Sequence, residues 1–140
     1  MKKEEEMTRE ALEKGMKTRR KVLGDEWVDR ALKNTTAFNA EFQDLITRYA
    51  WNEIWNRPRL THKERRLIVI GTLVALGHWE EFRLHARAAL ESSDLEVDDL
   101  KEILLQQAIY CGVPTANHAF REAKEVIDDF SSGGRRKKPR

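Results

Sequence analysis

The stretch LIVIGTLVAL, residues 67–76, constrains the fold of this chain more than any other feature. By composition alone it could be a buried strand or a buried helix, because a short apolar run has no decisive periodicity. The preceding residues, Thr61-His62-Lys63-Glu64, match a capping box, in which a threonine and a glutamate satisfy the first free N–H groups of a helix. We therefore predict a helix that is apolar on nearly every side. One small domain offers little material to cover such a helix, so subunit contacts are expected.

Every other strongly periodic segment also predicts helix. Apolar positions recur at helical spacing over residues 8–22, 26–33, 35–55, 79–92, 97–110 and 114–130. Gly24 should end the first segment and Asp25 should cap the second. Pro58 should end the third, because proline disfavours helical geometry in the residue before it. With no alternating strand pattern or hairpin signal, the sequence predicts an all-α domain of about six or seven helices over residues 1–130.

Charge is distributed unevenly along the chain. The last ten residues, SSGGRRKKPR, carry five positive charges and no acid, whereas the formal charge of the whole chain is +2. The other 130 residues therefore sum to −3, so the predicted helices together carry no excess of positive charge. A nucleic-acid-binding domain would need basic residues clustered on a folded element. We accordingly expect no nucleic-acid partner and interpret residues 131–140 as a disordered basic tail.

Cysteine content and hydropathy narrow the class of protein further. The single cysteine, Cys111, excludes an intrachain disulfide and any CxxC redox or zinc motif. The first residues, MKKEEEMTREAL, lack the apolar core of a secretory signal. No segment reaches the roughly 18 apolar residues that span a membrane. The sequence predicts a cytoplasmic protein with no membrane partner.

The stretch GHWEEFRLHARAAL, residues 77–90, carries the clearest candidate chemistry. His78, Glu81 and His85 are three and four residues apart, so on a helix they share one face. Two imidazoles and a carboxylate could hold a transition metal, although metal-binding helices favour histidines four residues apart and these are seven apart. The same groups could exchange protons near neutral pH, or could form an ordinary polar face. The residues alone leave these interpretations open, and we predict no metal site.

Two further groups of residues could bind a small acid. Arg48, Trp55 and Arg57 lie in a stretch rich in arginine and aromatic residues, a combination that can hold a planar or carboxylated molecule. The tryptophans could instead be core or interface anchors. His118 follows the turn CGVP, where the N-terminus of a helix offers free N–H groups to an anion or simply carries polar residues.

Four segments together resemble the carboxymuconolactone decarboxylase family of the alkylhydroperoxidase-like superfamily. They are GMKTRRKVLGDEWVDRAL (15–32), FQDLITRYAWNEIWNRPRL (42–60), HWEEFRLHARAAL (78–90) and LKEILLQQAIYCGVPTANHAF (100–120). Peroxidases of the superfamily carry a CxxCxxxH motif, whose positions here hold His78, Glu81 and His85, so thiol peroxidase chemistry is excluded. The resemblance implies an all-α homo-oligomer, commonly a homohexamer. Arg66 and the turn ESSDLEVDD depart from the family pattern and leave the details of the substrate open.

The resemblance also implies a reaction. The substrate would be a small unsaturated lactone dicarboxylate that loses CO₂ to give 3-oxoadipate enol lactone, in the protocatechuate branch of the β-ketoadipate pathway. Because the electrons can flow through the C=C bond into the lactone carbonyl, this carboxy-lyase would need no cofactor. On this basis we expect His85 to be the general acid or the donor to the lactone oxygen. Glu81 would orient it or relay a proton, and His78 is a further catalytic candidate.

The same resemblance suggests residues that bind the substrate. Arg48 or Arg57, with Trp55, would hold a substrate carboxylate, and His118 would close the pocket. Three alternatives stay open: a decarboxylase or isomerase of a related lactone acid on the same scaffold, a non-enzymatic helical assembly, and a metal-dependent hydrolase.

Overall fold

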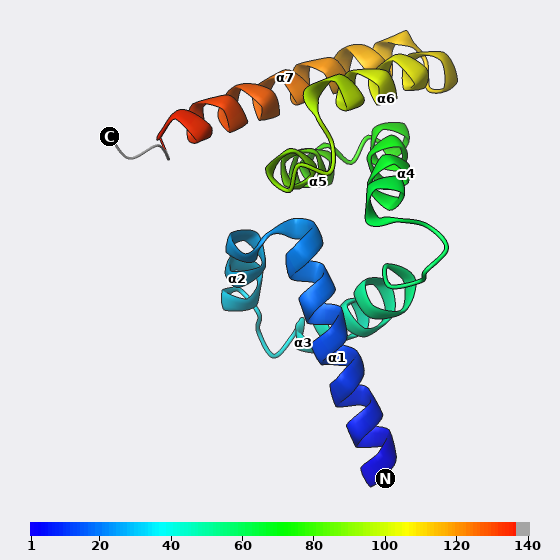
Figure 1. The fold of residues 1–140 in the computed structure, drawn as a ribbon, viewed down its shortest axis with the longest axis vertical. Coiled ribbons are helices and arrows are strands. Elements are labelled where there is room, and N and C mark those ends of the chain that lie inside the picture. The colour runs from blue at the N-terminus through cyan, green and yellow to red at the C-terminus, as the bar shows by residue number, and fades with distance from the viewer. Residues whose placement is uncertain (137–140) are drawn as a thin grey trace. The chain divides into compact units, whose positions relative to one another are not determined.

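The computed structural model describes residues 1–136, in which every regular element is a helix (Figure 1), as the all-α prediction requires. The elements are α1 (Lys2–Leu23), α2 (Asp25–Lys33), α3 (Ala40–Ile46), the π-helix η1 (Thr47–Ile54), α4 (His62–Leu76), α5 (Trp79–Glu91), α6 (Val97–Tyr110) and α7 (Val113–Arg136). The chain divides into two compact units, Met1–His62 and Lys63–Arg140. No helix within the described residues is both long and apolar enough to cross a membrane.

In the first unit, α1 packs along η1. Gly15 makes the closest approach, because a Cβ there would lie 2.1 Å from the carbonyl oxygen of Thr47. Gly24 ends α1 as predicted and has φ of 90°, a conformation that favours glycine. Asp25, however, is the first residue of α2 rather than its cap, and its carboxylate accepts a hydrogen bond from Arg20 at 3.1 Å.

The segment predicted as one helix over residues 35–55 consists of two elements. Helix α3 begins at Ala40, after a turn in which the Thr36 N–H donates to Asn39 Oδ1 at 2.8 Å. From Thr47 to Ile54 the chain is a π-helix. Apolar spacing over eight residues does not separate i+4 from i+5 hydrogen bonding, so the pattern predicted the helix but not its type. Short π-helices are frequent at functional sites.

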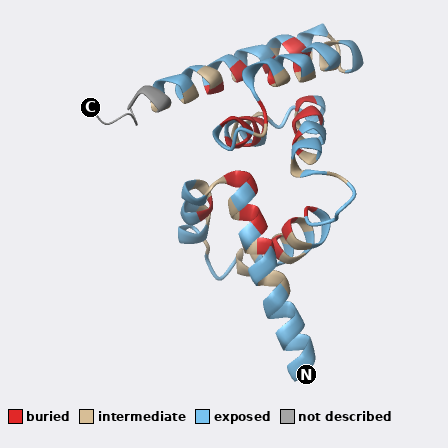
Figure 2. Cartoon of the chain, viewed as in Figure 1, coloured by how far each residue is buried: buried red, intermediate tan, exposed pale blue. Residues whose placement is uncertain are grey.

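The second unit has one apolar core, formed by α4, α5, α6 and α7. Its buried members are Ile70, Val74, Phe82, Ala86, Ala89, Leu90, Leu95, Leu100, Leu104, Ala119, Ala123 and Val126. Helix α7 packs against both α5 and α6, and each helix of the unit carries buried positions (Figure 2). Two buried alanines on α5, Ala86 and Ala89, and two on α7, Ala119 and Ala123, belong to this core. Helix α6 spans residues 97–110, the range predicted for it.

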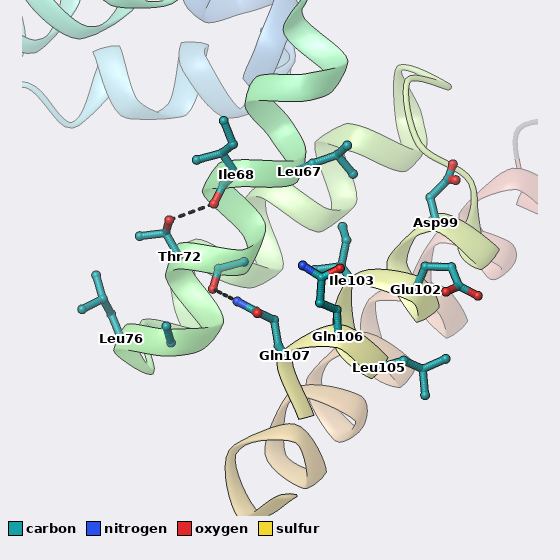
Figure 3. A pocket seen from close by; sticks show the side chains of 12 residues that line it. Leu67, Ile68, Thr72, Leu76, Asp99, Glu102, Ile103, Leu105, Gln106 and Gln107 are labelled. Carbon is teal, nitrogen blue, oxygen red and sulfur yellow. Dashed lines mark hydrogen bonds between the residues drawn. The ribbon is translucent and has the colours of Figure 1, made fainter. Parts of the chain in front are cut away.

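Helix α4 begins directly after Thr61, so the apolar run is a helix and not a strand. Only part of its surface is covered within the chain, because Ile68 is 57% exposed and Leu76 is 62% exposed. These exposed residues line a groove of about 1070 Å³ between α4 and α6. Figure 3 shows the groove, across which Gln107 Nε2 donates to the carbonyl oxygen of Gly71 at 2.8 Å.

Helix α7 continues to Arg136, six residues beyond the predicted end at residue 130. The first part of the predicted basic tail is therefore a continuation of this helix. The rest of that predicted tail, residues 137–140, lies outside the described residues.

Candidate active site

His85 is a buried histidine on α5, with only 9% of its surface exposed. Burial, followed by the positive charge of Arg66, lowers its pKa from the usual 6.5 to about 4. Both effects disfavour the imidazolium, since burial removes water from the charge and the guanidinium repels it. At neutral pH His85 is a neutral imidazole, which can donate or accept a hydrogen bond but holds no extra proton.

Arg66 is more deeply buried than His85 and has 1% of its surface exposed. Its Nε donates to Asp94 Oδ2 at 2.8 Å, which ties α4 to the turn after α5. The sequence marked Arg66 only as a departure from a family pattern. Its spacing of four residues from Ile70 and eight from Val74 placed it on the buried stripe of α4, and that signal could have identified it.

The other two members of the predicted triplet lie at the surface. Glu81 is exposed on α5, and His78 is exposed and precedes the first residue of that helix. Although the spacing predicted a shared face, Glu81 and His78 are exposed and do not form a compact cluster with the buried His85. Among the described residues, no three histidine, cysteine or acidic side chains are grouped so that they could hold a metal ion.

His118 belongs to a different cluster, between α5 and α7. Its ring stacks on Trp79, with centroids 4.2 Å apart and planes 6° from parallel. Its Nε2 lies 3.2 Å from Glu122 Oε1, and Arg83 donates from Nη1 to the other carboxylate oxygen of Glu122. Arg83 first, and then His118, lower the pKa of Glu122, so this residue is a carboxylate at neutral pH.

This cluster borders a pocket of about 370 Å³ at the end of α4 and the start of α7. The lining residues are Val74, Ala75, Leu76, Gly77, Trp79, Pro114, Thr115 and His118. Sequence reasoning singled out His118 but missed Trp79, Arg83 and Glu122. Trp79 and Arg83 are four residues apart on α5, and His118 and Glu122 are four apart on α7, so each pair shares a face of its helix. What the sequence could not show is that these two faces meet.

The three predicted carboxylate-binding residues all belong to the first unit. Arg48 is half-buried and borders a pocket of about 260 Å³ between α1 and η1. Trp55 is buried, with its ring 5.3 Å from that of Trp51, which fits the alternative reading of a core anchor. Arg57 is exposed. The second unit holds the other predicted residues, His78, Glu81, His85 and His118.

Comparison with known proteins identifies relatives over most of the chain. Residues 40–125 match the family model described as carboxymuconolactone decarboxylase family. The chain is 41% identical to 4-carboxymuconolactone decarboxylase of Acinetobacter baylyi over 116 residues, which is 83% of this chain and 86% of the relative. It is 36% identical to nitrosuccinic acid decarboxylase npaB of Metarhizium robertsii over 135 residues, or 96% and 94% of the two chains. A 4-carboxymuconolactone decarboxylase of Pseudomonas putida is 58% identical over 36 residues, 26% of this chain and 75% of that one.

These findings confirm the predicted resemblance and the predicted class of enzyme, a carboxy-lyase. They do not settle the substrate, because the two relatives matched over most of the chain are named for different acids. In sequence and in its all-helical fold, the chain belongs to the carboxymuconolactone decarboxylase family.

Proposed function

We propose that the protein is a 4-carboxymuconolactone decarboxylase, which converts its lactone substrate into 3-oxoadipate enol lactone in the cytoplasm, within the protocatechuate branch of the β-ketoadipate pathway. The observation that carries this proposal is the 41% identity to an enzyme of that name over 83% of the chain. The second candidate substrate is nitrosuccinic acid, which the identity of 36% over 96% of the chain favours.

Both candidate substrates share one chemical feature. Each is a small dicarboxylic acid in which the carbon that loses CO₂ is joined to a group that accepts electrons. In the lactone the electrons pass through the C=C bond to the carbonyl oxygen, and in nitrosuccinic acid they pass to the nitro group. The protein then has to bind carboxylates, stabilise the oxygen on which charge develops, and supply a proton to carbon.

The burial of His85 restricts the role that it can have in this reaction. Of the two roles predicted for it, the general acid conflicts with a pKa of about 4, because almost no imidazolium is present at neutral pH. A neutral imidazole N–H can still donate a hydrogen bond to an oxygen that becomes negatively charged. Glu81 and His78 stay predicted partners of His85. Arg48, Arg57 and Trp55 stay predicted residues for a substrate carboxylate.

We also propose that copies of the chain associate through the groove between α4 and α6. Its exposed apolar residues, including Ile68 and Leu76, lie on a helix whose other side is already in the core. Apolar surface of this kind is stabilised when a second chain removes it from water. A homohexamer, as the family resemblance implies, is the expected assembly.

A direct assay tests the proposed reaction. 4-Carboxymuconolactone is generated in situ, purified protein is added in the presence of EDTA, and both loss of the lactone and release of CO₂ are followed. Nitrosuccinic acid is assayed in parallel at the same concentration. We expect kcat/KM to be higher for the lactone by at least about tenfold, the effect of roughly 1.4 kcal/mol of discrimination. A preference for nitrosuccinic acid would replace the first candidate by the second, and no turnover of either acid would refute both.

A further inference from the structure

The pocket between α4 and α7 presents hydrogen-bond donors to whatever occupies it. The Trp79 indole nitrogen lies beside the Gly77 turn, where a Cβ on Gly77 would be 3.8 Å from it. Thr115 and His118 also line the pocket, and their side chains carry a hydroxyl and two ring nitrogens. Among the described residues, neither the Trp79 N–H nor the Thr115 hydroxyl has an acceptor. A pocket with such a lining suits a ligand rich in acceptor oxygens, such as a carboxylate or a lactone.

His118 is held in one orientation at the edge of this pocket. Stacking on Trp79 fixes the plane of its ring, and the contact with Glu122 fixes which nitrogen faces the carboxylate. Arg83 holds Glu122 from the other side. With Nε2 occupied by Glu122, Nδ1 is the nitrogen left to exchange a proton with a ligand. A carboxylate that orients a histidine is a common arrangement for general acid–base catalysis.

We propose that this pocket holds the reacting lactone and that His118 delivers the proton that takes the place of CO₂, an inference that rests on the proposed function. In this step the bond between the ring carbon and its carboxylate breaks, and CO₂ leaves without the electron pair. That pair moves through the C=C bond to the lactone oxygen. In this step His118 is an imidazolium whose Nε2–H is donated to Glu122, and its Nδ1 proton moves to the carbon next to the carbonyl. The neutral imidazole that results then takes up a proton from the solvent. Glu122 and Arg83 are positioning residues, since they act through His118.

The pocket and His85 lie on different sides of α5. Trp79 and His85 are six residues apart, which at about 100° per residue places them about 120° apart around the helix. The pocket therefore opens on a different face of α5 from the one that carries His85. The pocket is large enough for such a ligand, since its volume of about 370 Å³ falls within the usual range for ligand sites. The proton therefore comes from His118 or from His85, and variants of the two histidines distinguish these alternatives.

The test uses the full chain and six variants, of which Glu122→Asp and His85→Gln are described with the expected results. His118→Ala removes the proposed donor, and His118→Gln keeps a polar side chain next to Glu122. Glu122→Gln removes the orienting charge. Asp128→Asn is the matched control, because Asp128 is also an ion-paired carboxylate on α7 but lies exposed beside Lys124. Far-UV circular dichroism and melting temperature establish that each variant is folded. Turnover in D₂O is followed by NMR at early times for the rate, and ²H NMR of the product in a chiral aligning medium resolves the configuration of the new C–D centre.

We expect His118→Ala and His118→Gln to lower kcat by about 10²-fold, with a smaller change in KM. Both should yield a mixture of the two C–D configurations, whereas the wild-type protein and Asp128→Asn should yield one. Added imidazole should restore part of the activity of His118→Ala, which a structural role alone would not predict. Glu122→Gln should reduce kcat less, and Glu122→Asp should recover part of the loss.

Two results would overturn the proposal. One is a folded His118→Ala variant that keeps the wild-type rate and a single configuration. The other is loss of that single configuration in His85→Gln but not in His118→Ala, which would place proton delivery at His85.

If the wild-type protein does not decarboxylate the lactone, the proposed function fails and the pocket is tested with cis,cis-muconate as an unreactive dicarboxylate. A saturable shift of the Trp79 indole N–H that disappears in His118→Ala would support the pocket, and no shift would refute it.

Discussion

Burial of His85 should make the stability of the protein depend on pH in a defined window. The pKa of this residue is about 4 in the folded chain, against a usual 6.5, and desolvation is the main cause. Between these values an unfolded chain binds a proton at His85 and the folded chain does not. The free energy of unfolding therefore falls as the pH is lowered through 6.5 and stops falling, for this residue, below about 4. The sign follows from the unfolded state binding more protons.

The size of the effect follows from the same two values. A difference of about 2.5 pKa units, at 1.36 kcal/mol for each unit, gives about 3 kcal/mol at the acid end of the window. The perturbation is His85→Gln, which removes the titrating group and keeps a polar side chain of similar length. Other groups titrate in this range as well, so the quantity to measure is the difference between the wild-type and variant curves.

Urea unfolding at pH 7, 6, 5 and 4, at one fixed protein concentration, provides those curves. We expect the wild-type protein to lose about 3 kcal/mol more than His85→Gln between pH 7 and pH 4. An NMR titration of the His85 ring protons should show no transition near pH 6.5. If the wild-type and His85→Gln proteins lose stability in parallel as the pH falls, and the His85 ring titrates near pH 6.5, then His85 is not desolvated and the reasoning is wrong.

Three further predictions follow from other contacts. Arg66→Gln should raise the pKa of His85, because it removes the positive charge that lowers this pKa, whereas Arg66→Lys keeps the charge and should leave the pKa low. If NMR titration gives the same His85 pKa in both variants, this prediction is wrong. Gly15→Ala should lower stability by about 1–3 kcal/mol, because its Cβ would lie 2.1 Å from the Thr47 carbonyl oxygen; an unchanged melting temperature would refute the close packing of α1 on η1. Ile68→Asp should reduce the assembly size measured by light scattering without loss of helicity, and an unchanged assembly size would exclude the α4–α6 groove as an interface.

Much of the helical framework could be predicted because its determinants are local. The start of α4 after Thr61 and the end of α1 at Gly24 depend on residues within one turn of the helix end. The bounds of α6 follow from apolar spacing in the same way. The π-helical geometry of η1 was not predictable, since it arises where α1 packs along that segment and its spacing resembles that of an ordinary helix.

The residues of the candidate site likewise combine features set by local sequence with features set by tertiary packing. The sequence by itself determined that His78, Glu81 and His85 come at helical intervals and that His118 lies near the start of a helix, because periodicity is a property of neighbouring residues. Only the tertiary structure decided that His85 is buried near Arg66 while Glu81 stays in water, and that His118 meets Trp79 and Glu122. A pKa depends on the water and charge around a group, and these are supplied by helices distant in the chain. The chemistry of each histidine was therefore set by the packing of α4, α5 and α7.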